Sequence, residues 1–115
     1  MKPQTIKRFL IISILFNFLM IGGVLNSEAL LRNGGKMPVL TNSQYSTTTH
    51  FSYQDKDEVE RWYLTDRIKI GNYVLSIGDF LTIISGTLLG LYGVYFIIQE
   101  MREYVTSYAF EGDKR

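Results

Sequence analysis

Two long apolar segments separated by a polar stretch dominate the pattern of this 115-residue chain. The first, residues 9–25, has no charged side chain in 17 positions, which is near the lower limit for a helix that crosses a bilayer. The second, residues 74–98, has 25 positions and a single charged side chain, Asp79, near its start. The pattern predicts an all-α membrane protein in which two transmembrane helices form a helical hairpin.

The remaining residues form three polar regions. Residues 1–8 are a short basic N-terminus, and residues 26–73 are predicted to be a largely irregular loop outside the membrane. In residues 99–115, apolar side chains recur with helical spacing, which predicts an amphipathic helical tail. The positive-inside rule places both termini in the cytoplasm and the loop on the extracytoplasmic side.

A cleaved signal peptide is the rival interpretation of the first apolar segment. The basic start and the apolar run fit that interpretation, and Ser27-Glu28-Ala29 is an acceptable cleavage site. A run of 17 apolar residues is longer than the usual core of a signal peptide, roughly 7–15 residues, so we favour a retained helix.

A turn motif opens the loop at Asn33, Gly34 and Gly35. The two glycines permit positive φ angles, which other residues rarely adopt. Pro38 restricts the preceding Met37 to an extended conformation. We therefore expect a sharp turn followed by extended chain.

Ser76 and Asp79 have the spacing of a capping box at the start of the second helix. The negative charge of Asp79 would also lie at the positive end of the helix dipole. Asp79 is the only ionisable residue inside an apolar segment, so proton or cation handling is the alternative role. We favour the cap, because Asp79 falls within the first helical turn.

Small side chains recur every four positions along the second segment and form one ridge. Such ridges let helix backbones approach closely in a membrane. The expected partner in the first segment is Asn17, with Ser13 one turn earlier on the same face, because a buried amide in lipid seeks a hydrogen-bond partner. The ridge consists of Gly78, Thr82, Gly86 and Gly90.

Three motifs occur in a fixed order: the turn motif Asn33-Gly34-Gly35-Lys36-Met37-Pro38-Val39, then Leu64-Thr65-Asp66-Arg67, then Ser76-Ile77-Gly78-Asp79-Phe80-Leu81. This arrangement resembles domain of unknown function 5317, a family of small bacterial membrane proteins. The family pattern is an apolar helix containing an asparagine, N-G-G-x-M-P-V, a polar loop, L-x-D, and S-I-G-D opening a final apolar helix. Asn17 occupies the asparagine position.

Members usually carry further apolar helices before this pair, so the chain resembles a C-terminal two-helix part. The resemblance implies an architecture in the bacterial plasma membrane and no chemistry.

Composition removes several kinds of site. A formal net charge of +1 offers no basic field for nucleic acid. The absence of cysteine and the single histidine, His50, exclude thiolate and multi-histidine metal sites. His50 with Met37 is weak evidence for copper. The acidic run lacks the glycine-containing pattern of a calcium loop, and consists of Asp55, Asp57, Glu58 and Glu60. We predict no cofactor, no metal and no catalytic constellation.

These observations favour a small non-enzymatic membrane protein. It is expected to act as an accessory or structural subunit, through helix–helix packing and its external loop. Its expected partners are membrane lipid and either another membrane protein or a second copy of the chain, and no small-molecule ligand can be assigned. The alternative is an oligomeric small transporter or channel-like protein that uses Asp79 and Asn17. A third class is an accessory of a surface enzyme, acting through the loop.

Overall fold

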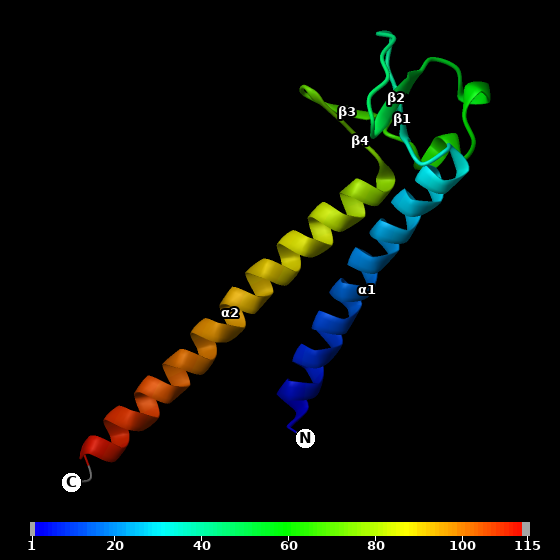
Figure 1. The fold of residues 1–115 in the computed structure, drawn as a ribbon. Coiled ribbons are helices and arrows are strands. Elements are labelled where there is room, and N and C mark those ends of the chain that lie inside the picture. The colour runs from blue at the N-terminus through cyan, green and yellow to red at the C-terminus, as the bar shows by residue number, and fades with distance from the viewer. Residues whose placement is uncertain (1, 114–115) are drawn as a thin grey trace.

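A computed structural model describes residues 2–113 of the chain. Two long helices, α1 (Pro3–Arg32) and α2 (Ile77–Asp113), form a hairpin that carries a small cap at its closed end (Figure 1). The molecule is elongated, with extents of 75, 29 and 20 Å. Parts of the expected N-terminal and tail regions, residues 1, 114 and 115, lie outside the described residues.

Helix α1 extends beyond its predicted apolar segment, residues 9–25, at both ends. Helix α2 begins three residues after the predicted start at residue 74 and extends beyond the predicted end at residue 98. Pro3 stands at the start of α1, where its missing N–H group costs no hydrogen bond. The predicted turn ends this helix: Gly34 and Gly35 have φ angles of 71° and 84°, and the Gly35 N–H group donates to the Leu30 carbonyl over 2.8 Å. The expected helical tail is a direct continuation of α2. Both helices are long and apolar enough to cross a membrane.

The cap, formed by the connection between the helices, contains four short strands. Strand β1 (Met37–Leu40) pairs in parallel with β2 (His50–Tyr53), and β3 (Ile68–Ile70) pairs antiparallel with β4 (Tyr73–Leu75). Two single-turn 3₁₀ helices lie between β2 and β3, at Lys56–Glu58 and Trp62–Leu64. The predicted all-α class therefore holds for the hairpin but not for the cap, because the loop that was expected to be largely irregular also contains short strands. Pairing of strands separated in sequence, as in β1 and β2, leaves no local signal.

The cap takes part of its core from the end of α1. Ala29 is fully buried against Met37 and Leu64, and Leu25 and Leu30 pack around them. Backbone hydrogen bonds from residue 66 hold the second motif beside β1: the Asp66 N–H group donates to the Pro38 carbonyl over 3.0 Å, and the Asp66 carbonyl accepts from Leu40 over 2.8 Å. The cap and the helix end thus form one packed unit.

The two helices pack closely at Gly22 of α1. A β-carbon on Gly22 would lie 2.5 Å from the Thr82 hydroxyl oxygen and 2.7 Å from the Gly78 carbonyl oxygen. With increasing distance from the cap, the two helices diverge (Figure 1). A β-carbon on Gly86 would be 3.7 Å from Leu19, and one on Gly90 would meet nothing within 4 Å among the described residues. Only the cap-side half of the predicted ridge is used inside the hairpin.

Asn17 does not join the helices, contrary to the prediction. It lies on an exposed face of α1, and its amide nitrogen donates to the Ser13 carbonyl of the same helix over 2.8 Å. An amide one turn above a carbonyl can satisfy its donor locally, so it needs no partner on α2. The residues that meet the cap-side half of the ridge are Gly22 and Asn26, five and nine residues closer to the cap than Asn17.

Candidate functional site

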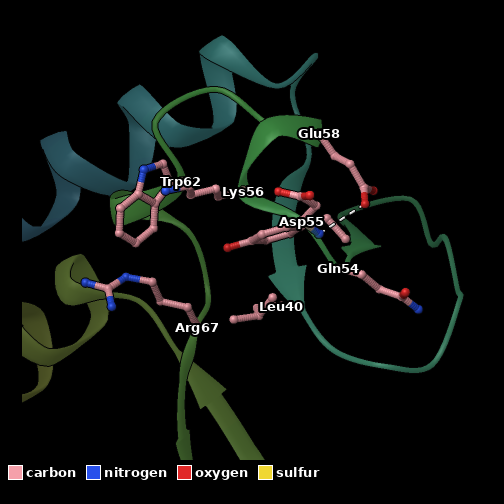
Figure 2. Close-up of a pocket in the computed structure, with 8 residues that line it drawn as sticks. Leu40, Gln54, Asp55, Lys56, Glu58, Trp62 and Arg67 are labelled. Atoms are coloured by element: carbon pink, nitrogen blue, oxygen red, sulfur yellow. Dashed lines mark hydrogen bonds between the residues drawn. The ribbon is translucent and has the colours of Figure 1, made fainter.

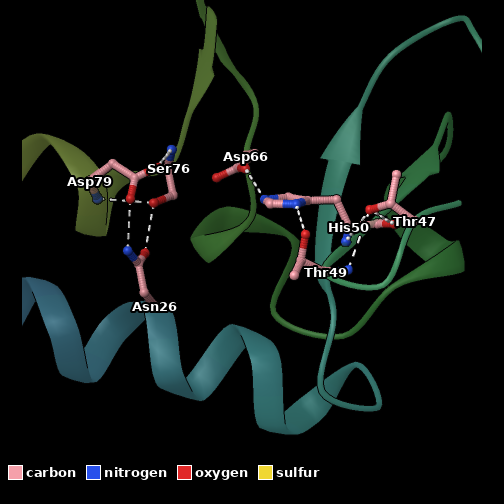
Figure 3. Close-up of polar contacts among 7 residues, drawn as sticks. All are labelled: Asn26, Thr47, Thr49, His50, Asp66, Ser76 and Asp79. Atoms are coloured by element: carbon pink, nitrogen blue, oxygen red, sulfur yellow. Dashed lines mark hydrogen bonds and ion pairs between the residues drawn. The ribbon is translucent and has the colours of Figure 1, made fainter. Parts of the chain in front are cut away.

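A polar junction joins α1 to the start of α2 (Figure 3). The amide nitrogen of Asn26 donates to Oδ1 of Asp79 over 2.8 Å. The amide oxygen of Asn26 accepts from the hydroxyl of Ser76 over 2.7 Å. Ser76 is fully buried, and the other two side chains are half-buried. One amide therefore binds both residues that begin α2, and a hydrogen bond to a charged acceptor is among the stronger kinds in proteins.

Ser76 and Asp79 also form the two reciprocal hydrogen bonds of a capping box. The Asp79 N–H group donates to the Ser76 hydroxyl oxygen over 3.0 Å, and the Ser76 N–H group donates to Oδ2 of Asp79 over 3.2 Å. Both carboxylate oxygens of Asp79 are thus occupied, one by its own helix end and one by α1. This geometry explains why the carboxylate can lie at the edge of an apolar segment.

A second carboxyl group, Asp66, lies in the cap beside this junction. Its residue surface is 6% exposed. Its Oδ2 atom is 3.7 Å from Nε2 of His50, whose Nδ1 atom is 2.7 Å from the Thr49 hydroxyl oxygen (Figure 3). The other carboxyl oxygen, Oδ1, is buried and accepts no hydrogen bond from any donor in residues 2–113. A buried acceptor without a donor is costly for a charged group.

The environment of Asp66 favours its protonated form. Burial raises the pKa of Asp66 from 3.8 to about 7, and the negative charge of the neighbouring Asp79 adds to this shift. Two neighbouring carboxylates cannot both ionise without repulsion, so one of them retains a proton. Asp66 is the deeper of the two and holds no compensating donor on Oδ1.

A pocket of about 380 Å³ opens between these groups. Its walls come from α1, the turn, the cap strands and α2, so all three sequence motifs meet there. No lysine or arginine is among its lining residues, which are Asn26, Leu30, Gly35, Met37, Thr49, His50, Asp66 and Asp79. The pocket is therefore a concave site with two carboxyl groups, one histidine and two apolar side chains in its wall.

A larger hollow of about 550 Å³ lies elsewhere on the cap, around Trp62 (Figure 2). The ring of Trp62 has the Arg67 guanidinium 5.3 Å and the Lys56 amine 5.9 Å from its centroid. Asp55 and Glu58 line the same hollow, so positive and negative charges balance. This balance selects no ligand charge, and the aromatic–cation contacts stabilise the cap surface.

The metal sites weighed from the sequence do not assemble. Within residues 2–113, no group of three or more histidine, aspartate or glutamate side chains is placed to hold a metal ion. His50 and Met37 line the same pocket, but His50 pairs with Asp66. In the acidic run, Asp55 and Glu58 form the capping box of a 3₁₀ helix.

The turn motif has a structural role. The Asn33 amide nitrogen donates to the carbonyl oxygens of Ala29 and Glu60, over 2.8 and 2.9 Å, and its amide oxygen accepts from the Glu60 N–H group over 3.0 Å. It thereby ties the end of α1 to the cap. Met37 and Pro38 are buried beneath.

Sequence reasoning missed three residues of this region: Gly22, Asn26 and Asp66. Gly22 and Asn26 lie at the end of the first apolar segment and at the residue that follows it, spaced like Gly78 and Thr82 on the facing helix. That matching spacing was the available signal. Asp66 stood in a motif but gave no sign of burial, which depends on the pairing of its backbone with β1.

Comparison with known proteins gives one match. A family model described as "Family of unknown function (DUF5317)" matches residues 9–97, which include the first apolar segment, the whole cap and all but the last residue of the second apolar segment. No curated protein matches the chain, and neither does any solved structure.

Proposed function

The chain belongs to the DUF5317 family, whose function is unknown, and we propose that it is a non-enzymatic membrane protein whose hairpin crosses the bilayer and binds a neighbouring membrane protein. In this proposal the chain resides in the bacterial plasma membrane with both termini in the cytoplasm. The cap then lies on the extracytoplasmic surface, with its pocket at the membrane boundary.

The observation that carries this proposal is the spacing of two polar pairs along the hairpin. Asn26 with Asp79 marks the cap end, and Arg8 with Glu100, whose side chains are 3.4 Å apart, marks the other end. Between the pairs, α1 has 17 residues and α2 has 20 residues without one charge. At about 1.5 Å per residue, the pairs are separated by about 27–32 Å, which is close to the thickness of the hydrocarbon core.

Side-chain exposure supports the same location. In the most apolar 18-residue stretch of each helix, only 6% of the stretch is buried inside the protein. Large apolar side chains such as Phe9, Phe16, Ile84 and Leu91 point outward, at 53–69% exposed. An apolar surface of this extent requires lipid or another protein around it.

The orientation rests on the charges near the ends of the helices. Lys2, Lys7 and Arg8 precede the uncharged part of α1, and Arg102 follows that of α2. Such an arrangement favours the cytoplasmic side for both termini. Retention of α1 is supported by its contacts, because cleavage after Ala29 would separate Asn26 from Asp79 and remove half of the junction.

A protein partner is supported by the end of α2, which continues to Asp113 as helix. Its apolar face is 62–69% exposed and consists of Met101, Tyr104, Val105 and Tyr108. Helix α2 is about 55 Å long, so its last turns extend well beyond a bilayer core. An apolar helix face outside the lipid favours another protein as its neighbour.

Affinity purification in a gentle detergent, followed by mass measurement of the intact complex, tests the proposal. A stoichiometric complex with one other membrane protein is expected. A symmetric complex of this chain alone would favour the alternative of an oligomeric transporter or channel-like protein. Replacement of Tyr104 and Tyr108 by serine should release the partner, whereas replacement of Glu103 and Thr106 by serine, on other positions of the same helix, should retain it.

A further inference from the structure

We propose that the pocket between Asn26, Asp66 and Asp79 binds the primary ammonium group of a small organic molecule. This inference concerns the cap and goes beyond the proposed membrane function, so either can fail without the other. It follows from the charge in the pocket, one oxygen atom without a donor, and the mixed chemistry of the wall.

The pocket has two carboxyl groups and no basic side chain except the titratable His50. The titratable groups that face Asp66 are His50 from β2 and Asp79 from α2, while α1 contributes the neutral Asn26. When both carboxyl groups are ionised, one positive charge between them relieves their repulsion. A proton supplies that charge when no ligand is bound, and an ammonium group can replace it.

The position for the charge is defined by Oδ1 of Asp66. This atom is buried and accepts no hydrogen bond from the described residues, whereas Oδ2 of the same group faces His50. In Figure 3 the oxygen of Asp66 not joined to His50 points toward Ser76 and Asp79. An ammonium group has three donors, so it can bind this oxygen and a second acceptor at the same time. Deprotonated Asp66 then gains the donor that it lacks.

The rest of the wall favours an organic cation over a bare metal ion. A volume of about 380 Å³ lies within the range of small-molecule sites and far exceeds that of one ion. Leu30 and Met37 provide apolar contacts for carbon atoms next to the charge. In the described part of the chain, no cluster of three metal-ligating side chains is present.

Calorimetric titration of the full chain in phosphatidylcholine nanodiscs tests the proposal, with n-butylammonium chloride as the probe. We expect saturable binding at about pH 8 that weakens at least about tenfold at about pH 5, where a carboxyl group with the raised pKa of Asp66 keeps its proton. The uncharged analogue n-butanol should not bind measurably. Equal binding of n-butanol, or no saturable binding of the amine, would overturn the proposal.

Matched variants assign the binding to the pocket. Asp66→Asn should weaken n-butylammonium binding at about pH 8 at least about tenfold and remove its pH dependence. Asp57→Asn makes the same charge change on the exposed side of the cap and should alter affinity less than about twofold. Circular dichroism of both variants verifies the fold. An unchanged affinity in Asp66→Asn would contradict the proposal without any need for further variants.

Two sources could supply the ammonium group, a free amine or the headgroup of phosphatidylethanolamine at the bilayer surface. Nanodiscs that contain phosphatidylethanolamine should weaken the apparent binding of n-butylammonium if the lipid is the natural occupant. Unchanged binding in these discs, with competition by free ethanolamine, indicates a soluble amine. Calcium chloride is the third probe in this experiment. Saturable calcium binding that displaces the amine and depends on Asp66 would overturn the proposal in favour of a metal-ion site.

Discussion

The amide nitrogen of Asn26 donates a hydrogen bond to Oδ1 of Asp79 over 2.8 Å, and it thereby joins the end of one long helix to the first turn of the other. The amide oxygen of Asn26 accepts from Ser76, so one side chain holds the whole start of α2. These two hydrogen bonds are made where the hairpin meets its cap, and they position Asp79 in the wall of the pocket.

Asn26→Ala should lower the free energy of unfolding by about 1.5–3 kcal/mol, because the carboxylate of Asp79 loses a donor in a half-buried site. Asn17→Ala is the matched control, since its amide bonds only to its own helix, and it should change stability by less than about 0.5 kcal/mol. Unfolding by a denaturing detergent in mixed micelles measures both. Equal losses for the two variants would mean that the junction does not stabilise the hairpin.

Adjacent glycines in α1 offer a second test of the packing. Gly22→Ala should destabilise the hairpin by about 1–3 kcal/mol, because its β-carbon would press on the backbone carbonyl of Gly78, 2.7 Å away. Gly23→Ala, which meets nothing within 4 Å in the described chain, should be neutral or stabilising by up to about 1 kcal/mol through helix propensity. The same detergent titration reports the difference, and the reverse order of the two variants would refute close packing at Gly22.

The open half of the ridge separates packing within the hairpin from packing with a partner. Gly90→Leu should leave hairpin stability unchanged within about 0.5 kcal/mol, because a side chain there has free space. The same change should reduce the yield of the partner complex in gentle detergent if small residues let a partner helix approach. Leu91→Ile is the control and should retain the complex. Full yield with Gly90→Leu would show that the partner binds elsewhere.

Stability should depend on pH through Asp66. Its pKa is raised to about 7 in the folded protein, from an ordinary value of 3.8. Between these values the folded chain holds a proton that the unfolded chain releases, so stability decreases as pH rises from about 4 to 7. A shift of this size corresponds to up to about 4 kcal/mol.

Asp66→Asn isolates this effect from His50 and the other titrating groups. The variant keeps the backbone hydrogen bonds of residue 66 to β1, and it should unfold with a smaller pH dependence than the natural chain. The difference in unfolding free energy between the two proteins, measured at about pH 5 and pH 8, should change in favour of the variant at the higher pH. A difference that is the same at both pH values would contradict the raised pKa.

Local patterns were sufficient to predict much of this architecture. The uncharged runs of α1 and α2, the positive φ angles at Gly34 and Gly35, and the capping pair Ser76 and Asp79 each depend on neighbours a few residues away. These features could therefore be predicted from the sequence alone.

The contacts that build the pocket could not be predicted in the same way. Asp66 is buried because its backbone pairs with Pro38 and Leu40, which lie more than twenty residues earlier in the chain. Asn17 and Asn26 are nine residues apart and therefore lie on opposite sides of α1. Only the register of the two helices decides which side, and so which asparagine, meets Asp79. Such long-range register depends on tertiary packing and has no local signature.

The central claim is that the uncharged parts of both helices cross the membrane with the cap outside. The chain has no cysteine, so single cysteines can be introduced at Ser46 in the cap and Ser107 near the end of α2. Labelling of intact cells with a membrane-impermeant maleimide tests the claim most directly. We predict that Ser46→Cys is labelled in intact cells and that Ser107→Cys is labelled only after the membrane is opened. Labelling of both positions from one side, or of Ser46→Cys only from the cytoplasmic side, would contradict this topology.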